Sequence, residues 1–135
     1  MINGINSREM ILEILLEIEE GEHSHVAIRN ALSKYQFLPK QDRAFITRVC
    51  EGTLEYRIQI DYIINSFSKV TVDKMKPAIR EILRSAVYQL KYMDSVPDSA
   101  VCNEAVKLAQ RKGFYNLKPF VNGVLRTIAR EMDQV

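Results

Sequence analysis

The sequence contains few of the residues that interrupt helices. Its 135 residues include five glycines, four prolines and no tryptophan. So few chain-breaking residues favour long helices over a fold with many turns. No apolar run approaches the roughly 18 residues of a membrane span, and residues 1–5 carry neither the basic region nor the apolar stretch of a secretory signal. We therefore expect a cytoplasmic protein without a membrane segment.

Cysteine and histidine are also scarce, which removes several kinds of site. Cys50 and Cys102 lie far apart and form no CxxC unit, so they predict buried free thiols rather than zinc ligands. His23 and His25 have no third ligand near them in the sequence. A glycine-rich nucleotide loop, a GxSxG elbow and an HExxH motif are all missing. We expect no catalytic residue, metal or cofactor in this chain.

Charge is distributed unevenly along the chain, although the net charge is only +2. Residues 1–38 contain three Lys or Arg and six Asp or Glu, a net charge of −3. Residues 39–135 contain sixteen Lys or Arg and eleven Asp or Glu, a net charge of +5. This polarity suits a nucleic-acid partner, and it equally suits a scatter of solvated charges. An acidic cluster predicts a solvated face; it consists of Glu17, Glu19, Glu20 and Glu22.

Hydrophobic periodicity predicts an all-α fold of about seven helices with no strand. The chain, 47% apolar, suits one domain over residues 1–135. Caps, prolines and glycines give the expected helices, with Asn6, Ser24 and either Asp98 or Ser99 as N-terminal caps. The helices are Asn6 to Gly21, Ser24 to Tyr35, Gln41 to Phe67 with a kink near the middle allowed by Gly52 and Arg57, Pro77 to Leu90, Asp98 or Ser99 to Gly113, and Asn116 to Ala129.

The last expected helix carries polar and flexible residues within an apolar pattern. Gly123 costs a helix interior about 1 kcal/mol relative to alanine, so its presence predicts close approach of another backbone or a ligand. Lys118 and Phe120 are a cation and an aromatic ring near the helix start, which suits contact with a phosphate and a base. With the polar Asn122 beside them, they are the first indication of RNA binding.

A second candidate surface follows the helix that begins at Pro77. Lys76, Arg80, Arg84 and Tyr88 recur every four residues, so they form one line along this helix. Three cations and a ring on one line can track a phosphate backbone and stack a base. In the alternative, Arg84 and Tyr88 are half-buried and paired within the bundle.

Three groups of segments together resemble the NusB fold family. They read DRAF at 42–45 with EGTL at 51–54, ILRSAVYQL at 82–90 with VP at 96–97, and NEAVKLA at 103–109 with FVNGVLR at 120–126. The resemblance covers almost the whole chain. It implies an all-α fold built from two packed helical subdomains, and RNA binding.

The family has two branches that resemble this sequence. One consists of free-standing transcription antitermination factors, which bind boxA RNA together with a small-subunit ribosomal protein. The other is the N-terminal RNA-binding domain of bacterial 16S rRNA cytosine-5 methyltransferases, and residues 42–54 and 124–130 look more like this branch. The S-adenosylmethionine domain of such an enzyme, with its Pro-Cys and Thr-Cys motifs, is missing. The chain is therefore expected to be either an excised N-terminal domain or a free-standing protein.

Carried over by position, the resemblance implies an RNA-facing surface that contains Arg8, the Tyr88-Gln89 pair and the start of the last helix. The candidate RNA-binding residues are then Arg8, Lys76, Arg80, Arg84, Tyr88, Gln89, Lys118, Phe120 and Asn122. Gln89 stands where the antitermination branch often has glutamate, which weakens the expectation of a ribosomal protein partner. The expected function is to position 16S rRNA for a methyltransferase domain. An antitermination factor is the alternative, and a protein-interaction module, able to form a homodimer, is a third hypothesis.

Overall fold

The computed structural model of the protein describes residues 6–132. Seven α-helices and two short 3-10 turns make up this part of the chain, and no strand occurs within it. The α-helices are α1 Ser7–Glu19, α2 Ser24–Lys34, α3 Lys40–Glu55, α4 Arg57–Phe67, α5 Pro77–Tyr92, α6 Asp98–Arg111 and α7 Lys118–Glu131, and the turns are η2 Val72–Lys74 and η3 Tyr115–Leu117. The predicted all-α fold of about seven helices is confirmed. Residues 1–5, where no secretory signal was expected, lie outside the described residues.

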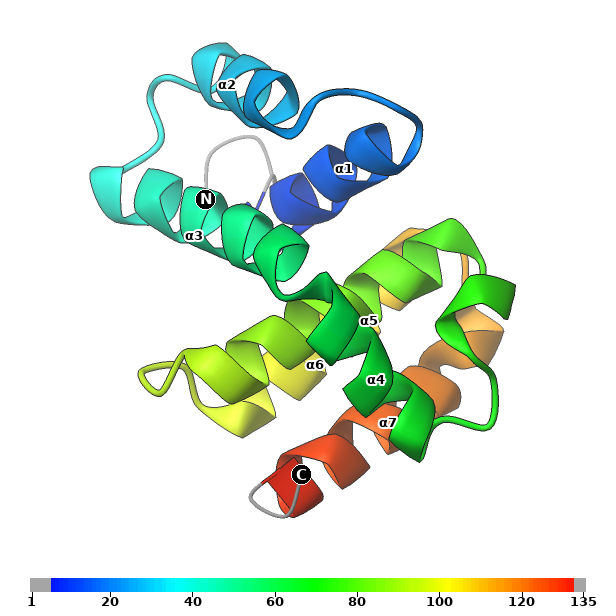
Figure 1. Ribbon diagram of the computed structural model, residues 1–135. Helices are drawn as coiled ribbons and strands as arrows, with labels where there is room; N and C mark the ends of the chain where they lie inside the picture. The colour runs from blue at the N-terminus through cyan, green and yellow to red at the C-terminus, as the bar shows by residue number, and fades with distance from the viewer. Residues whose placement is uncertain (1–5, 133–135) are drawn as a thin grey trace.

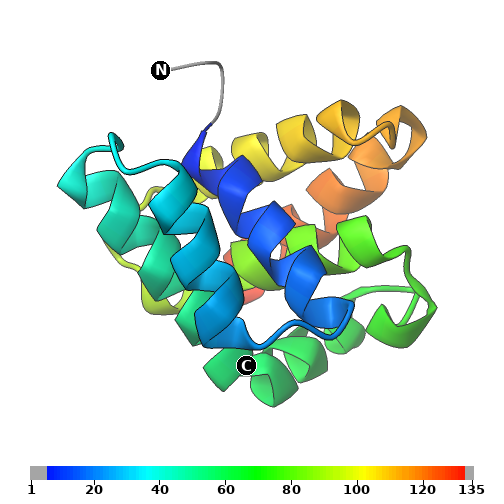
Figure 2. The same ribbon diagram turned by 90° about the horizontal axis from the view of Figure 1, so that it is seen from above.

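The helices form two packed groups around one central helix (Figure 1). Helices α1, α2 and α3 pack together, and α4 to α7 form the second group. Helix α5 contacts α1, α3, α4, α6 and α7, so it joins the two groups. Figure 2 shows α1 lying across α5 with α6 beside its start. The expected two packed subdomains are confirmed, and they share one continuous hydrophobic core.

Local sequence explains several helix ends. The Asn6 side chain accepts a hydrogen bond of 2.7 Å from the Glu9 amide and caps α1. Gly21 and Gly113 follow helices with φ of 118° and 86°, values that glycine adopts without strain. Pro77 occupies the first turn of α5, as predicted. The Ser24 and Asp98 caps were wrong, because both residues are the first residues of their helices and no side-chain cap bond forms there.

The long helix expected from Gln41 to Phe67 is two helices. Helix α3 ends before Tyr56, and α4 begins directly after it. Gly52 lies inside α3 and has a packing role: a Cβ atom there would lie 2.1 Å from Cε1 of Tyr88. The glycine therefore makes room for the tyrosine of α5, and the chain changes direction four residues later.

The last helix begins at Lys118, after η3, and not at Asn116. The expected close approach of another backbone at Gly123 was also wrong, because no other group lies within 4 Å of a Cβ atom built there and the residue is exposed. The alternative, approach of a ligand to Gly123, stays a prediction. Within residues 6–132, no helix combines the length and the apolar character needed to cross a membrane.

Candidate nucleic-acid interface

Arg84, the third residue of the predicted α5 line, faces the protein interior. Its guanidinium donates two hydrogen bonds of 2.8 Å to the carboxylate of Asp61 on α4. A third bond, of 2.6 Å, reaches Glu81 one turn earlier on α5. The Arg84 side chain is only 12% exposed. This placement favours the alternative in which Arg84 is paired within the bundle.

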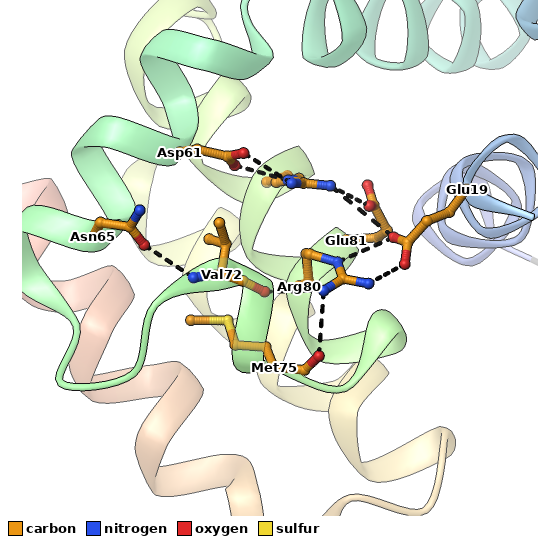
Figure 3. Close-up of polar contacts among 8 residues, drawn as sticks. Glu19, Asp61, Asn65, Val72, Met75, Arg80 and Glu81 are labelled. Carbon is orange, nitrogen blue, oxygen red and sulfur yellow. Dashed lines mark hydrogen bonds and ion pairs between the residues drawn. The ribbon is translucent and has the colours of Figure 1, made fainter.

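Arg80 is also held by the protein itself (Figure 3). Its Nη1 donates to the carbonyl oxygens of Val72 at 3.0 Å and Met75 at 3.4 Å. The other side of its guanidinium pairs with Glu19 at the end of α1. Arg80 therefore ties the η2 loop and α1 to α5. Of the three predicted cations on this line, Lys76 alone is exposed.

Glu81 is a buried carboxyl group beside a second carboxyl group. It is 4% exposed and lies against Arg84 and Glu19 (Figure 3). Burial and hydrogen bonding to Glu19 raise the pKa of Glu81 to about 8, although Arg84 acts against this rise. For Glu19, burial disfavours ionisation, but the bond from Arg80 and the nearby positive charges outweigh it and lower the pKa. The Glu81 carboxyl therefore keeps its proton to a higher pH than an ordinary glutamate does, whereas Glu19 ionises more readily.

Tyr88 and Gln89 are inside the bundle as well. Tyr88 is 5% exposed, and its ring stacks on Tyr92, which stacks on Tyr56, with centroids 5.2 and 4.5 Å apart. Gln89 is 2% exposed, donates to the Ser85 carbonyl and accepts a bond of 3.1 Å from Nε of Arg8. Neither side chain is placed to stack on or contact an unpaired base. Both residues therefore lie beneath the surface, and Gln89 contacts the predicted site only through its hydrogen bond from Arg8.

Arg8 lies at the edge of the surface between α1 and α6. Its guanidinium carbon is 5.2 Å from the ring centroid of Phe45, and Gln89 holds its Nε. Burial lowers the pKa of Arg8, and the nearby Glu104 of α6 opposes that effect. The acidic neighbour and the stacking ring explain a cation in the first turn of a helix, where the dipole disfavours it.

The start of α7 presents a cation and an exposed ring together. Lys118 Nζ lies 4.4 Å from the centroid of the Tyr115 ring and donates a bond of 2.8 Å to Gln110 of α6. Tyr115 is 64% exposed. Phe120, the ring that the sequence suggested, is partly buried and packs against the core instead. Tyr115 was missed because it precedes the helix; its position three residues before Lys118 was the available signal.

An arginine links α6 to α7 next to this pair. Arg126 donates a bond of 2.7 Å to Asn103 of α6 and one of 3.1 Å to Asn122, one turn earlier on α7. Together with the charged side chains beside them, these residues form one polar strip on the outside of the second group. We call it the α6–α7 face; it consists of Arg8, Asn103, Glu104, Lys107, Gln110, Arg111, Tyr115, Lys118, Asn122 and Arg126.

The α6–α7 face contains more cations than carboxylates. Of its members, Glu104 is acidic, and it pairs with Lys107 at 3.1 Å. The remaining cations are neutralised by no carboxylate of the described residues in an ion pair. The face therefore offers positive charge, amide groups and an exposed ring, which are the groups that bind phosphates and unpaired bases.

The described residues contain no other group of side chains that is typical of a catalytic or metal site. Cys50 and Cys102 are buried free thiols, as predicted, and burial raises the pKa of each. The rings of His23 and His25 stack with centroids 6.1 Å apart. In residues 6–132, no three His, Cys, Asp or Glu side chains are grouped so that they could hold a metal ion.

Comparison with known proteins identifies relatives along nearly the whole chain. The model of the NusB family matches residues 5–130. A probable ribosomal RNA small subunit methyltransferase B of Bacillus subtilis is 35% identical over 92% of this chain, which spans 28% of that protein. The chain spans a similarly small part, 29%, of the Synechocystis methyltransferase that it matches. The transcription antitermination protein NusB of Bacillus velezensis is 33% identical over 94% of this chain and 95% of its own length.

Solved structures share the fold. The antitermination factors NusB and NusE in complex with double-stranded RNA include a chain that superposes with a TM-score of 0.83, covering 92% of this chain and 93% of its own, at 21% identity. A NusB structure from T. maritima gives the same TM-score at 26% identity, covering 93% of this chain and 89% of its own.

Proposed function

The chain belongs to the NusB family, and on this basis we propose that it binds RNA through the α6–α7 face. The observation that carries the proposal is the surplus of unpaired cations on this face beside an exposed ring. Lys118 and Arg126 supply positive charge, and Tyr115 supplies a stacking surface. Such combinations bind single-stranded RNA, because bases stack on aromatic rings while cations neutralise phosphates.

The assignment of this face keeps part of the site implied by the resemblance. Arg8, Lys118 and Asn122 lie on the face. Phe120 supports it from the core side, and Lys76 lies at the start of α5. Arg80, Arg84, Tyr88 and Gln89 contribute by holding the bundle together.

The finer function that we propose is that of a transcription antitermination factor, acting in the bacterial cytoplasm on boxA-type RNA with a small-subunit ribosomal protein as partner. Its support is the extent of similarity: the matched region is 95% of the length of the NusB proteins of two Bacillus species. The solved complex of NusB with NusE and RNA has the same fold as this chain. We assign no catalytic step to it.

A second function is favoured by a different observation. The 35% identity to the Bacillus subtilis methyltransferase equals or exceeds that to the antitermination proteins matched over most of the chain. In that case this domain would position 16S rRNA for a separate methyltransferase domain, which would bind S-adenosylmethionine. Residues 6–132 form helices with no strand followed by a glycine-rich loop, so they do not fit that cofactor.

Fluorescence anisotropy with two labelled RNAs tests the face and the function together. The probes are a boxA-type single strand and a 16S rRNA hairpin, each at 50 and 200 mM salt. We expect Lys118→Ala to weaken binding and to lower the salt dependence by about one released counterion. Tyr115→Ala removes a stacking ring and should cost roughly 5- to 100-fold in affinity. Preference for the single strand supports the antitermination function, and preference for the hairpin supports the methyltransferase one.

Two exposed residues that do not belong to the α6–α7 face serve as matched controls. Tyr62 on α4 is 68% exposed, close to the 64% of Tyr115, and Lys69 is exposed beyond the end of α4. Tyr62→Ala and Lys69→Ala should leave both affinities unchanged. If these controls weaken binding while the α7 variants do not, the interface is misplaced. Binding of neither RNA at 50 mM salt would favour the protein-interaction module.

A further inference from the structure

A groove with a volume of about 420 Å³ runs between α1 and α2, which lie side by side in Figure 2. Its floor includes Met10 and Ile14, and Glu9, Glu13 and Glu17 line its α1 side. We propose that this groove binds an extended segment of a partner protein that carries alternating lysine or arginine and apolar side chains. This interaction is additional to the proposed RNA binding and does not depend on it.

The charge of the groove selects the kind of partner. Its three glutamates follow one another every four residues, so they form a row along α1. Glu13 pairs with Lys112 at the end of α6, whereas Glu9 and Glu17 have no ion pair within residues 6–132. A row of carboxylates repels RNA phosphates and attracts cationic side chains. The occupant is therefore a basic protein segment and not RNA.

The spacing of the glutamates fits an extended segment. The side chains on one face of an extended chain repeat every ~6.8 Å. Four residues along α1 advance ~6 Å. Every second side chain of an extended segment therefore lies close to successive glutamates, and the intervening side chains can contact the apolar floor.

An aromatic pair lies at one end of the groove. Tyr35 is a lining residue, and Phe37 is 53% exposed and meets it edge-on with ring centroids 6.2 Å apart. Lys34 also lines the groove, and its ammonium lies 5.6 Å from the centroid of the Tyr35 ring. The lining therefore contains one cation and three carboxylates, and the exposed Phe37 ring adds apolar surface for the same basic and apolar segment.

A labelled model peptide tests the proposal without knowledge of the natural partner. The probe is a fluorescein-labelled heptapeptide of alternating lysine and leucine, titrated with the whole chain in an anisotropy assay. We expect Glu9→Gln/Glu17→Gln to weaken binding at least fivefold. The matched control is Glu51→Gln/Glu55→Gln, an exposed pair on α3 that changes the net charge equally and lies outside this groove. It should change the affinity less than twofold.

Two further measurements decide where and how the peptide binds. Amide chemical shifts of Ala31 and Phe37 should move on titration, and an isomeric peptide with its lysines in one block should bind at least threefold more weakly. Equal weakening by both glutamine pairs would reduce the effect to general charge attraction and overturn the proposal. Groove shifts that appear on concentrating the free chain, or on adding the RNA probes, would also overturn it, because a second copy or RNA would then be the occupant. Unchanged RNA affinity of Glu9→Gln/Glu17→Gln keeps this test separate from the proposed function.

Discussion

Replacing Glu81 by glutamine should remove a large part of the pH dependence of stability. Glu81 is buried among Glu19, Arg84 and Asp61, where two guanidinium groups face three carboxyl groups. If all five groups were ionised, the cluster would carry one uncompensated negative charge. A proton on Glu81 removes that charge, and glutamine is the neutral side chain that most resembles the protonated form.

The direction of this pH dependence follows from the difference in the pKa of Glu81 between the folded and unfolded chains. In the folded protein, burial and the hydrogen bond to Glu19 raise the pKa of Glu81 from 4.5 to about 8. The folded chain therefore retains a proton that the unfolded chain releases, and the free energy of unfolding falls as the pH rises through this window. Glu19 acts in the opposite direction, since its lowered pKa gives stability that is lost only as the solution becomes acidic. Measurements from pH 6 upward thus separate Glu81 from Glu19. The raised pKa values of the buried Cys50 and Cys102 thiols add a smaller decline close to pH 9, which Glu81→Gln retains.

The size of this loss in the free energy of unfolding follows from the shift in pKa, because each pKa unit corresponds to about 1.4 kcal/mol. Between pH 6 and pH 9 the wild-type protein should lose about 2 to 3 kcal/mol of its free energy of unfolding through this group. That is a large fraction of the 5 to 15 kcal/mol that is typical of a whole domain. The Glu81→Gln variant should match the wild type within about 1 kcal/mol at pH 6 and exceed it at pH 9.

Urea unfolding followed by circular dichroism at pH 6, 7, 8 and 9 measures these free energies directly. The control is Glu17→Gln, an exposed glutamate on α1, which should keep the pH profile of the wild type. A wild-type free energy that is flat from pH 6 to pH 9 would refute the reasoning. So would an equal decline in Glu81→Gln, because the decline would then come from another group.

Two further predictions concern packing and pairing. Gly52→Ala should lower the free energy of unfolding by about 3 kcal/mol, because its Cβ would meet the buried Tyr88 ring; Gly123→Ala, with open space around it, should raise that free energy by about 0.5 to 1 kcal/mol. Arg84→Met leaves Asp61 without its partner and should cost about 3 kcal/mol in denaturant unfolding. The folded Arg84→Met protein should bind RNA as the wild type does, and a fivefold loss of affinity would contradict the interior placement.

Much of the fold could be predicted because its signals are local. The Asn6 cap, Pro77 and the two glycines with positive φ act on residues within one turn, and each marked a helix end correctly. The break at Tyr56 lies within the kink expected from Gly52 and Arg57, but local signals did not predict that the helix ends there. It accompanies the fit of Gly52 against Tyr88, residues 36 positions apart in the numbering. A glycine that accommodates a distant ring has the same sequence pattern as a glycine that permits a kink.

The candidate site shows the same difference between residues whose partners are near in the sequence and residues whose partners are distant. Lys118 was predicted from its position at the start of a helix and Asn122 as a polar residue within an apolar helical pattern, and their partners Gln110 and Arg126 lie eight and four residues away. Arg84 was ambiguous because Asp61 lies 23 residues away, on another helix. Helical periodicity places residues on one line, but it does not say whether solvent or another helix faces that line. On α5, which is surrounded by five other helices, the line faces protein.

The acidic first part and the basic second part of the sequence do not translate directly into charged surfaces, because some of their charges pair with one another in the folded protein. Two cations of the basic part, Arg80 and Arg84, neutralise carboxylates between helices, so neither contributes free charge to an RNA surface. Two carboxylates of the acidic part, Glu19 and Glu13, are paired in turn. The groups left without an ion pair include four cations of the α6–α7 face and the glutamates Glu9 and Glu17 of the α1–α2 groove, and further cations are spread over α2 to α5. Because these two surfaces attract opposite charges, the RNA and the basic protein segment that we propose as ligands would not compete for one surface.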